Sequence, residues 1–217
     1  MMKKIGVTQR VSVIEDYGER RDCLDQAWTE LLESFDLVPI PLPNTVSNVS
    51  DYLEAVDIEG VVLTGGNDVA DLDSPSNPAP ERDRFERTLI TYCLSREVPI
   101  LGVCRGMQLL YTYFNGDLKH IGGHINEDHR VSFNPADGVD SDLQFPESTT
   151  VNSYHTYGID PEDVPEELIN IGKAPDGSIE CFTHREHQLY GIKWHPERGS
   201  GHEIDDQLIS YLFEGSR

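Results

Sequence analysis

Apolar residues along this chain alternate between short continuous runs and longer stretches with helical spacing. The continuous runs predict strands at 4–11, 37–43, 60–66 and 99–103. The helical spacing predicts helices at 21–35, 50–56, 81–97 and 105–114. Strands that alternate with helices form parallel sheets covered on both faces. The first half therefore predicts an α/β fold with a central, mainly parallel sheet.

The second half carries shorter apolar runs and fewer helical patterns. Strand-like runs occur at 149–159, 168–174, 178–184 and 188–195, and an amphipathic helix is expected at 202–215. Asp176 and Gly177 form a candidate hairpin turn, and the polar segment 126–146 predicts a loop. Because no repeat or linker interrupts the pattern, we expect one domain over 1–217 with added small β elements.

The charge of the chain excludes some classes of partner. The 217 residues hold 39 Asp and Glu against 17 Lys and Arg, which gives a net charge of -22. Such a surface repels nucleic acid and anionic membranes, so neither is an expected partner. It also resembles proteins of salt-loving organisms, in which counterions screen self-repulsion. No signal peptide or membrane-spanning run is seen, so we expect a cytoplasmic protein with reduced thiols.

One cysteine stands where a strand gives way to a helix. In the stretch GVCRGMQ, Cys104 follows an apolar run and lies between Gly102 and Gly106. A helix N-terminus stabilises a thiolate, and flanking glycines permit the close backbone approach of a sharp elbow. Cys104 is therefore a candidate nucleophile. The alternative is a buried cysteine whose neighbouring glycines only ease packing.

A cysteine nucleophile needs a base and a group that orients the base. His195 and Glu197 end a predicted strand, two residues apart, with a restraining proline between them. His120 and His124 have helical spacing, but the glycines between them make a helix unfavourable. A metal site at those two histidines is a weaker alternative, and we expect no metal and no cofactor.

Acyl transfer also needs hydrogen-bond donors for a developing oxyanion. Gly66 lies in a glycine turn at the end of a neighbouring predicted strand, and Arg105 follows the candidate nucleophile directly. The backbone amides of these two residues are the candidate donors.

Five motifs, in this order, resemble the class I glutamine amidotransferase superfamily. They are VLTGGND, RDRFE, PILGVCRGMQ, VNSYHTYG and YGIKWHPE. Within the superfamily, the chain is most similar to the γ-glutamyl hydrolase branch, peptidase family C26. The resemblance implies a flavodoxin-like three-layer sandwich and a cysteine-dependent hydrolase that releases glutamate through a thioester. It also implies a triad of Cys104, His195 and Glu197, with Gly66 and Arg105 forming the oxyanion hole.

The resemblance further implies where a γ-glutamyl group binds. Gln108 matches a glutamine that holds this group, and Asn152, Ser153 and His155 match a substrate-binding strand. His155 could equally serve a structural hydrogen bond. Tyr157 stands where the family often has glutamine, which disfavours γ-aminobutyrate as the leaving amine. The pattern also resembles members that cleave γ-glutamyl nucleotide adducts such as γ-glutamyl-CDP-amidate.

Three other functions share parts of this pattern. A glutaminase that supplies ammonia to a separate synthetase would use the same triad. A catalytically silent ligand-binding protein would keep the fold, although it has no physical need for all three triad residues. A peptidase acting on polypeptides is a third alternative, but a glutamyl-binding Gln108 fits a small-molecule substrate better.

Overall fold

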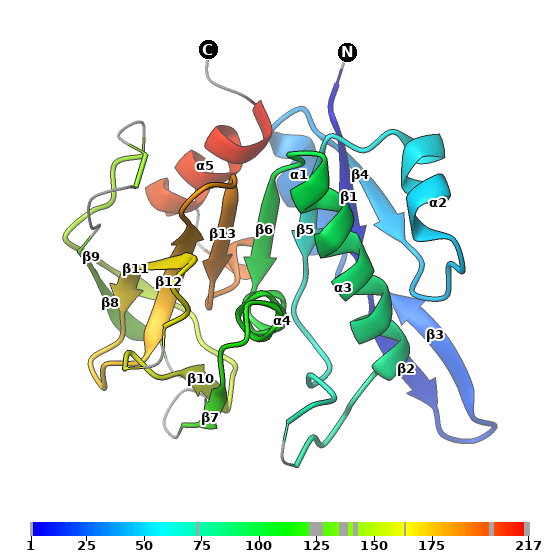
Figure 1. The fold of residues 1–217 in the computed structure, drawn as a ribbon, viewed down its shortest axis with the longest axis horizontal. Coiled ribbons are helices and arrows are strands. Elements are labelled where there is room, and N and C mark those ends of the chain that lie inside the picture. Colours follow the sequence, from blue (N-terminus) through cyan, green and yellow to red (C-terminus); the bar gives the residue numbers. More distant parts are fainter. Residues whose placement is uncertain are drawn as a thin grey trace.

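The computed structural model describes residues 2–72, 74–121, 128–134, 139–140, 143–162, 164–199 and 202–214 (Figure 1). Its described residues include a nine-stranded sheet with strand order β4-β1-β5-β6-β13-β12-β11-β8-β9. The first five strands in this order pair in parallel. They are β4 (Val38–Leu42), β1 (Lys4–Thr8), β5 (Gly60–Leu63), β6 (Ile100–Val103) and β13 (Leu189–Ile192).

The other four strands extend the sheet in antiparallel fashion. They are β12 (Ile179–His184), β11 (Leu168–Lys173), β8 (His129–Phe133) and β9 (Ser148–Val151). Two small antiparallel ribbons lie outside this sheet. One pairs β2 (Arg10–Ile14) with β3 (Glu19–Cys23), and the other pairs β7 (Leu118–His120) with β10 (Tyr157–Ile159).

Helices cover both faces of the sheet because successive strand residues point to opposite sides. On β5, Val62 packs into one core cluster, with α1 (Ala27–Ser34) and α5 (Glu203–Ile209). Val61 and Leu63 pack into the other cluster. That second cluster contains side chains of α2 (Val49–Val56), α3 (Pro80–Ser95) and α4 (Arg105–Tyr113). The expected three-layer α/β fold is confirmed.

Some local expectations were wrong. Residues 21–23 belong to β3 and not to a helix, because their backbones pair with β2 in an exposed ribbon. The segment 126–146, expected as a loop, contains β8 at its described start. The sequence indicates Ser50 as the N-cap of the second helix, but the N-cap of α2 is Asn48, whose side chain accepts from the Asp51 amide. The turn at Gly177 is confirmed between β11 and β12, with the glycine at φ +89°.

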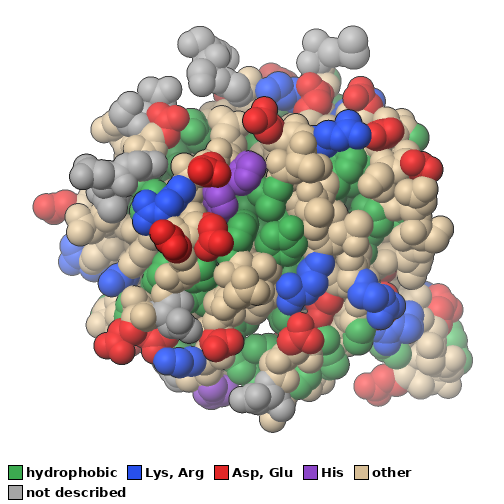
Figure 2. All heavy atoms as spheres, in the orientation of Figure 1, with side chains coloured by type: hydrophobic (Ala, Val, Ile, Leu, Met, Phe, Trp, Pro, Cys, Tyr) green, Lys and Arg blue, Asp and Glu red, His purple; other side chains and the backbone are tan. Residues whose placement is uncertain are grey.

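The carboxyl ends of β5, β6 and β13 meet at one rim of the sheet. Gly102 and Val103 pair with Gly191 and Ile192, so the residues that follow these strands lie side by side. Acidic side chains are spread over the face shown in Figure 2 and are not gathered in one patch. In the described part of the chain, no helix is long and apolar enough to cross a membrane.

Candidate active site

Cys104 occupies a sharp elbow between β6 and α4. Its backbone has φ 53° and ψ -101°, a left-handed conformation that is unfavourable for a residue with a Cβ. The Cys104 amide donates to the Ile192 carbonyl at 2.8 Å, which ties the elbow to the end of β13. Cys104 is the N-cap of α4, the end of the helix at which the first-turn amides have no intrahelical partner.

The two flanking glycines are required by close packing. A Cβ on Gly106 would lie 2.0 Å from the Leu63 carbonyl oxygen, and one on Gly102 would lie 3.0 Å from the Gly106 backbone. Any side chain at 106 would therefore push α4 away from β5. The expectation of a glycine-dependent elbow is confirmed.

His195 and Glu197 lie where β13 ends, next to the elbow. Glu197 Oε1 is 2.7 Å from His195 Nδ1, and Glu197 is in a short 3₁₀ turn, Pro196–Arg198. Asn152 holds the His195 backbone from the other side. The Asn152 side-chain nitrogen, Nδ2, donates to the His195 carbonyl at 2.9 Å. The side-chain oxygen, Oδ1, accepts from the His195 backbone amide at 2.8 Å. These contacts let Asn152 position His195, a role that the sequence did not indicate; its predicted contact with substrate stays a prediction.

The electrostatics of the site favour a thiolate paired with an imidazolium. Burial alone would raise the pKa of the Cys104 thiol, but a hydrogen bond to His195 and the charges of His195 and Lys193 lower it. Burial likewise opposes protonation of His195, yet hydrogen bonds to Cys104 and Glu197 raise its pKa to about 9. The thiol is therefore activated in the folded protein.

The other buried cysteines show the opposite behaviour. Burial raises the pKa of Cys93 to about 12 and also raises that of Cys181. Both pack in the hydrophobic core, as expected for inert thiols. Cys23, which was expected in a helix, is half-buried and lies at the end of β3.

The glycine turn after β5 is fixed by one buried arginine. Arg82 Nη2 donates to the Thr64 carbonyl at 2.7 Å, and Arg82 Nη1 donates to the carbonyls of Gly65 and Gly66 at 3.1 and 2.5 Å. In a trans peptide the N–H points opposite to the C=O. The amide of Gly66 therefore points away from Arg82. A Cβ on Gly65 would lie 2.7 Å from His195 Cε1, so this turn packs against His195.

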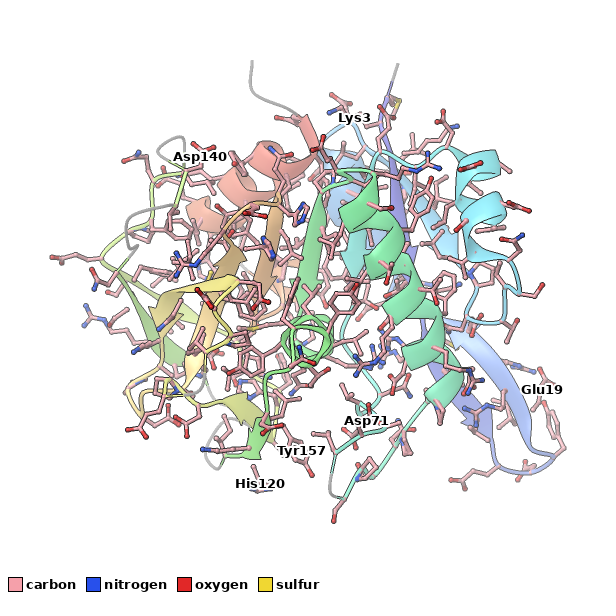
Figure 3. The ribbon with its side chains drawn as sticks, viewed as in Figure 1. Lys3, Glu19, Asp71, His120, Asp140 and Tyr157 are labelled. Carbon is pink, nitrogen blue, oxygen red and sulfur yellow. The ribbon has the colours of Figure 1, made fainter. Side chains whose placement is uncertain are left out.

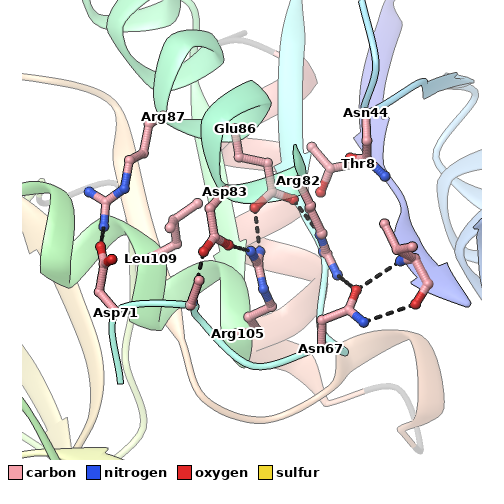
Figure 4. Close-up of polar contacts among 12 residues, drawn as sticks. Thr8, Asn44, Asn67, Asp71, Arg82, Asp83, Glu86, Arg87, Arg105 and Leu109 are labelled. Carbon is pink, nitrogen blue, oxygen red and sulfur yellow. Dashed lines mark hydrogen bonds and ion pairs between the residues drawn. The ribbon is translucent and has the colours of Figure 1, made fainter. Parts of the chain in front are cut away.

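A buried network of charged side chains connects the glycine turn after β5 to α3 and α4 (Figure 4). Arg82 Nε also pairs with Glu86 at 2.8 Å, and Arg105 pairs with both Glu86 and Asp83. Asp83 accepts in addition from the Ala70 amide at 2.7 Å. The Arg105 side chain is thus structural, while its backbone amide stays in the first turn of α4, beside the thiol.

The remaining predicted substrate residues lie at different depths. Gln108 is one turn into α4, nearly buried, and donates to the Tyr157 carbonyl at 2.9 Å. Ser153 is buried. His155 is also buried, and its Nε2 lies 3.5 Å from Glu180 Oε1. His155 thus faces the protein interior, which matches its structural alternative.

A second polar cluster near Cys104 was missed by sequence reasoning. Glu180 is buried, and His129 Nε2 lies 3.2 Å from one of its oxygens. Burial would raise the pKa of Glu180, but hydrogen bonds to the two histidines lower it. The ammonium of Lys193 is also fully buried, with the charges of Cys104 and Glu180 nearby. In the sequence, the one signal for this cluster is Lys193, a charged residue inside an otherwise apolar strand-like run.

The weaker metal alternative finds no support in the described part of the chain. His120 lies in β7 and is exposed, whereas His124 falls outside the described residues. In the described ranges, no group of three or more His, Cys, Asp or Glu residues could hold a metal ion.

Comparisons with known proteins agree with this geometry. Residues 4–197 match the Peptidase C26 family. The chain is 35% identical over 199 residues to a gamma-glutamyl-CDP-amidate hydrolase of Campylobacter jejuni, covering 91% of each chain. It is 27% identical to anthranilate synthase component 2 of Methanothermobacter marburgensis, over 93% of this chain and 97% of that protein.

The fold is likewise similar to a known structure. A glutamine amidotransferase from Thermotoga maritima superposes with a TM-score of 0.68 at 17% identity, covering 97% of this chain and 82% of that one. The elbow, the matched residues and the identity to the Campylobacter hydrolase lead to one conclusion: this chain belongs to the Peptidase C26 family and is a hydrolase of amide bonds.

Proposed function

We propose that this protein hydrolyses the γ-glutamyl amide bond of a small molecule and releases glutamate. The observation that carries the proposal is the placement of Cys104, at the start of α4, beside His195: a Cβ on Gly65 would lie 2.7 Å from His195 Cε1 and 3.6 Å from Cys104 Cβ. Hydrogen bonding to His195 lowers the pKa of the Cys104 thiol. The Glu197 carboxylate, 2.7 Å from the other ring nitrogen of His195, would orient the base. This arrangement supplies a nucleophile, a proton carrier and a group that orients the carrier.

The reaction has two stages in this proposal. The Cys104 thiolate attacks the γ-carbonyl carbon and forms a C–S bond. His195 then donates its proton to the nitrogen as the C–N bond breaks, so that the amine leaves and a thioester remains. In the second stage, His195 takes a proton from water as the water oxygen attacks the thioester. The C–S bond breaks, glutamate departs, and the thiolate–imidazolium pair is restored.

The amides of Gly66 and Arg105 are the proposed donors to the oxyanion. Support comes from Arg82, which holds the carbonyl of Gly65 and so turns the Gly66 amide the other way. The Arg105 amide begins α4 directly after the nucleophile. Two donors fixed in this way would stabilise developing negative charge without reorganisation during the reaction.

We propose a γ-glutamyl nucleotide adduct of the γ-glutamyl-CDP-amidate type as the substrate. The reason is the identity of 35%, over 91% of each chain, to a hydrolase named for that compound. Free glutamine is the second candidate, because the relatives include a component of anthranilate synthase.

Glutamate release by purified protein tests the proposal. Wild type is offered γ-glutamyl-CDP-amidate, γ-glutamyl-γ-aminobutyrate and glutamine, and acid-quenched samples are analysed by mass spectrometry. We expect glutamate from the nucleotide adduct and a glutamyl mass on Cys104. Cys104→Ala should show neither, whereas Cys93→Ala, which removes a buried core thiol, should retain turnover. Turnover by Cys104→Ala would refute the mechanism, and glutamate from glutamine alone would favour the ammonia-supplying function.

A further inference from the structure

Two arginines line the surface beside His195. A narrow pocket adjoins His195 and has both arginines in its lining, with Asp25, Trp28 and Gly65. One of these arginines is Arg10, at the start of β2, and the other is Arg198, directly after Glu197. Neither has a part in the proposed mechanism.

Arg10 is held against the glycine turn by Asn67. The Asn67 side chain accepts from the Val11 amide at 2.8 Å and donates to the Val11 carbonyl at 2.9 Å (Figure 4). These reciprocal bonds fix the β2–β3 ribbon next to Gly66. A Cβ on Gly66 would lie 3.2 Å from Arg10 Cδ and 3.6 Å from Arg10 Nε. The Arg10 side chain therefore lies over the proposed oxyanion glycine.

Arg198 lies next to Tyr154, which in turn lies beside His195. Its guanidinium is 5.4 Å from the centre of the Tyr154 ring, and this ring is 5.5 Å from the His195 ring, edge to face. Tyr154 is exposed, so its ring forms part of the open surface beside the imidazole. Arg198 Nη2 also pairs with Asp25 at 3.1 Å.

Two carboxylates lie near the two guanidinium groups: Asp25, and Glu197, whose Oε1 is 3.7 Å from Arg198 Nε and 2.7 Å from His195 Nδ1. Burial would raise the pKa of Asp25, but the Ala27 amide and the charges of Arg198 and Arg10 lower it, so this carboxylate serves both arginines. In the described part of the chain, no carboxylate lies within 4.0 Å of an Arg10 nitrogen. A net charge of -22 repels anions over the rest of the surface. Paired arginines suit recognition of phosphate oxygens.

We propose that Arg10 and Arg198 form an anion subsite that binds a phosphate or pyrophosphate carried by the leaving amine. This inference rests on the proposed γ-glutamyl hydrolysis, because it is His195 that would protonate the leaving nitrogen. Any group attached to that nitrogen leaves past Tyr154 and the two guanidinium groups. The subsite thus selects substrates by the charge of the part that is released.

A larger groove at the same rim is the competing location. It is lined by Arg87, Lys119 and Tyr157 among other residues, and Asp71, His120 and Tyr157 lie at its edge in Figure 3. Its cations are already paired: Arg87 lies 3.3 Å from Asp71, and Lys119 pairs with Asp160. Arg198 is paired as well, with Asp25 at 3.1 Å, so the two locations differ in Arg10, which has no carboxylate within 4.0 Å among the described residues.

A matched pair of substrates tests the subsite. γ-Glutamyl-O-phosphoethanolamine and γ-glutamyl-ethylamide differ by one phosphate group, so the ratio of their kcat/KM values reports recognition of the anion. We expect wild type to prefer the phosphorylated substrate by about tenfold or more. The double variant Arg10→Gln, Arg198→Gln should lose most of this preference, and Arg87→Gln should keep it. The ratio cancels any general effect on His195.

A second measurement needs no turnover. Inorganic pyrophosphate should slow alkylation of Cys104 by iodoacetamide in wild type and in Arg87→Gln, but not in the double variant. Equal kcat/KM values for the two substrates in wild type would overturn the inference while leaving γ-glutamyl hydrolysis intact. Loss of the preference in Arg87→Gln would also overturn it and would assign the anion to the larger groove. If neither of these substrates nor γ-glutamyl-CDP-amidate releases glutamate, the proposed function fails, and protection by pyrophosphate alone decides the subsite.

Discussion

Replacing Gly65 by alanine should disable the catalytic pair while leaving the fold intact. The new Cβ would lie 2.7 Å from His195 Cε1 and 3.6 Å from the Cβ of Cys104. Ordinary contacts between carbon atoms are about 3.5–4.0 Å, so the imidazole would have to retreat by roughly 1 Å. The turn itself cannot yield easily, because Arg82 holds the carbonyls on either side of Gly65.

A shift of that size breaks the geometry around His195. The Glu197 contact is 2.7 Å, and hydrogen bonds of this kind weaken beyond about 3.2 Å. A misplacement of about 1 Å in an active site can cost about 100-fold in rate. We therefore expect kcat/KM of Gly65→Ala to fall by about 100-fold. The free energy of unfolding should change by no more than about 1 kcal/mol, since alanine also stiffens the unfolded chain.

Two assays together check this reasoning. Glutamate release gives kcat/KM, and the pH dependence of Cys104 alkylation by iodoacetamide reports the thiol without any substrate. Gly199→Ala is the matched control, because its Cβ would meet only ordinary contacts, the nearest at 3.5 Å. The reasoning is refuted if Gly65→Ala keeps at least about one third of wild-type kcat/KM and an unchanged alkylation profile, a level far above the expected loss.

Two further predictions follow from the titrating groups. In Cys104→Ala the pKa of His195 should fall below about 9, because the thiolate that helps to raise it is gone; an NMR titration that still gives about 9 would contradict the assigned pair. Burial raises the pKa of Asp205 to about 6 from 3.8, so its favourable contribution is full below about pH 4 and is lost as pH rises through about 6. In Asp205→Asn the side-chain oxygen can still accept from Trp194, so urea unfolding should show the variant gaining up to about 3 kcal/mol on wild type between pH 4 and 7; no gain would contradict this.

The sequence was most informative where neighbouring residues determine the geometry. The elbow at Cys104 needs two glycines within a few positions, and the base and its partner are two residues apart. Both arrangements could be predicted because local spacing carries them. The approach of Cys104 to His195 was expected from the parallel order of the strands, since the carboxyl ends of parallel strands meet at one rim.

Long-range contacts of polar side chains were beyond sequence reasoning. The spacing of apolar residues around Cys23 imitates a helix, yet the backbone there pairs with β2. Asn152 matched a substrate-binding segment, and its side-chain amide also forms two hydrogen bonds to the backbone of His195, which nothing in the local sequence indicates. Arg10 and Arg198 lie far apart in the chain and line the same pocket only because the start of β2 lies beside the glycine turn. The spacing of apolar residues predicts helices and strands, but it does not predict which distant polar side chains come together.

The left-handed backbone at position 104 limits how this enzyme can change. A residue with a Cβ at φ 53° stores on the order of 1–3 kcal/mol of conformational energy. Only glycine would relieve that tension at no steric cost, and glycine has no sulfur. At position 104, the substitution that would raise the stability of the fold would also remove the thiol. Stabilising substitutions therefore have to lie elsewhere in the molecule.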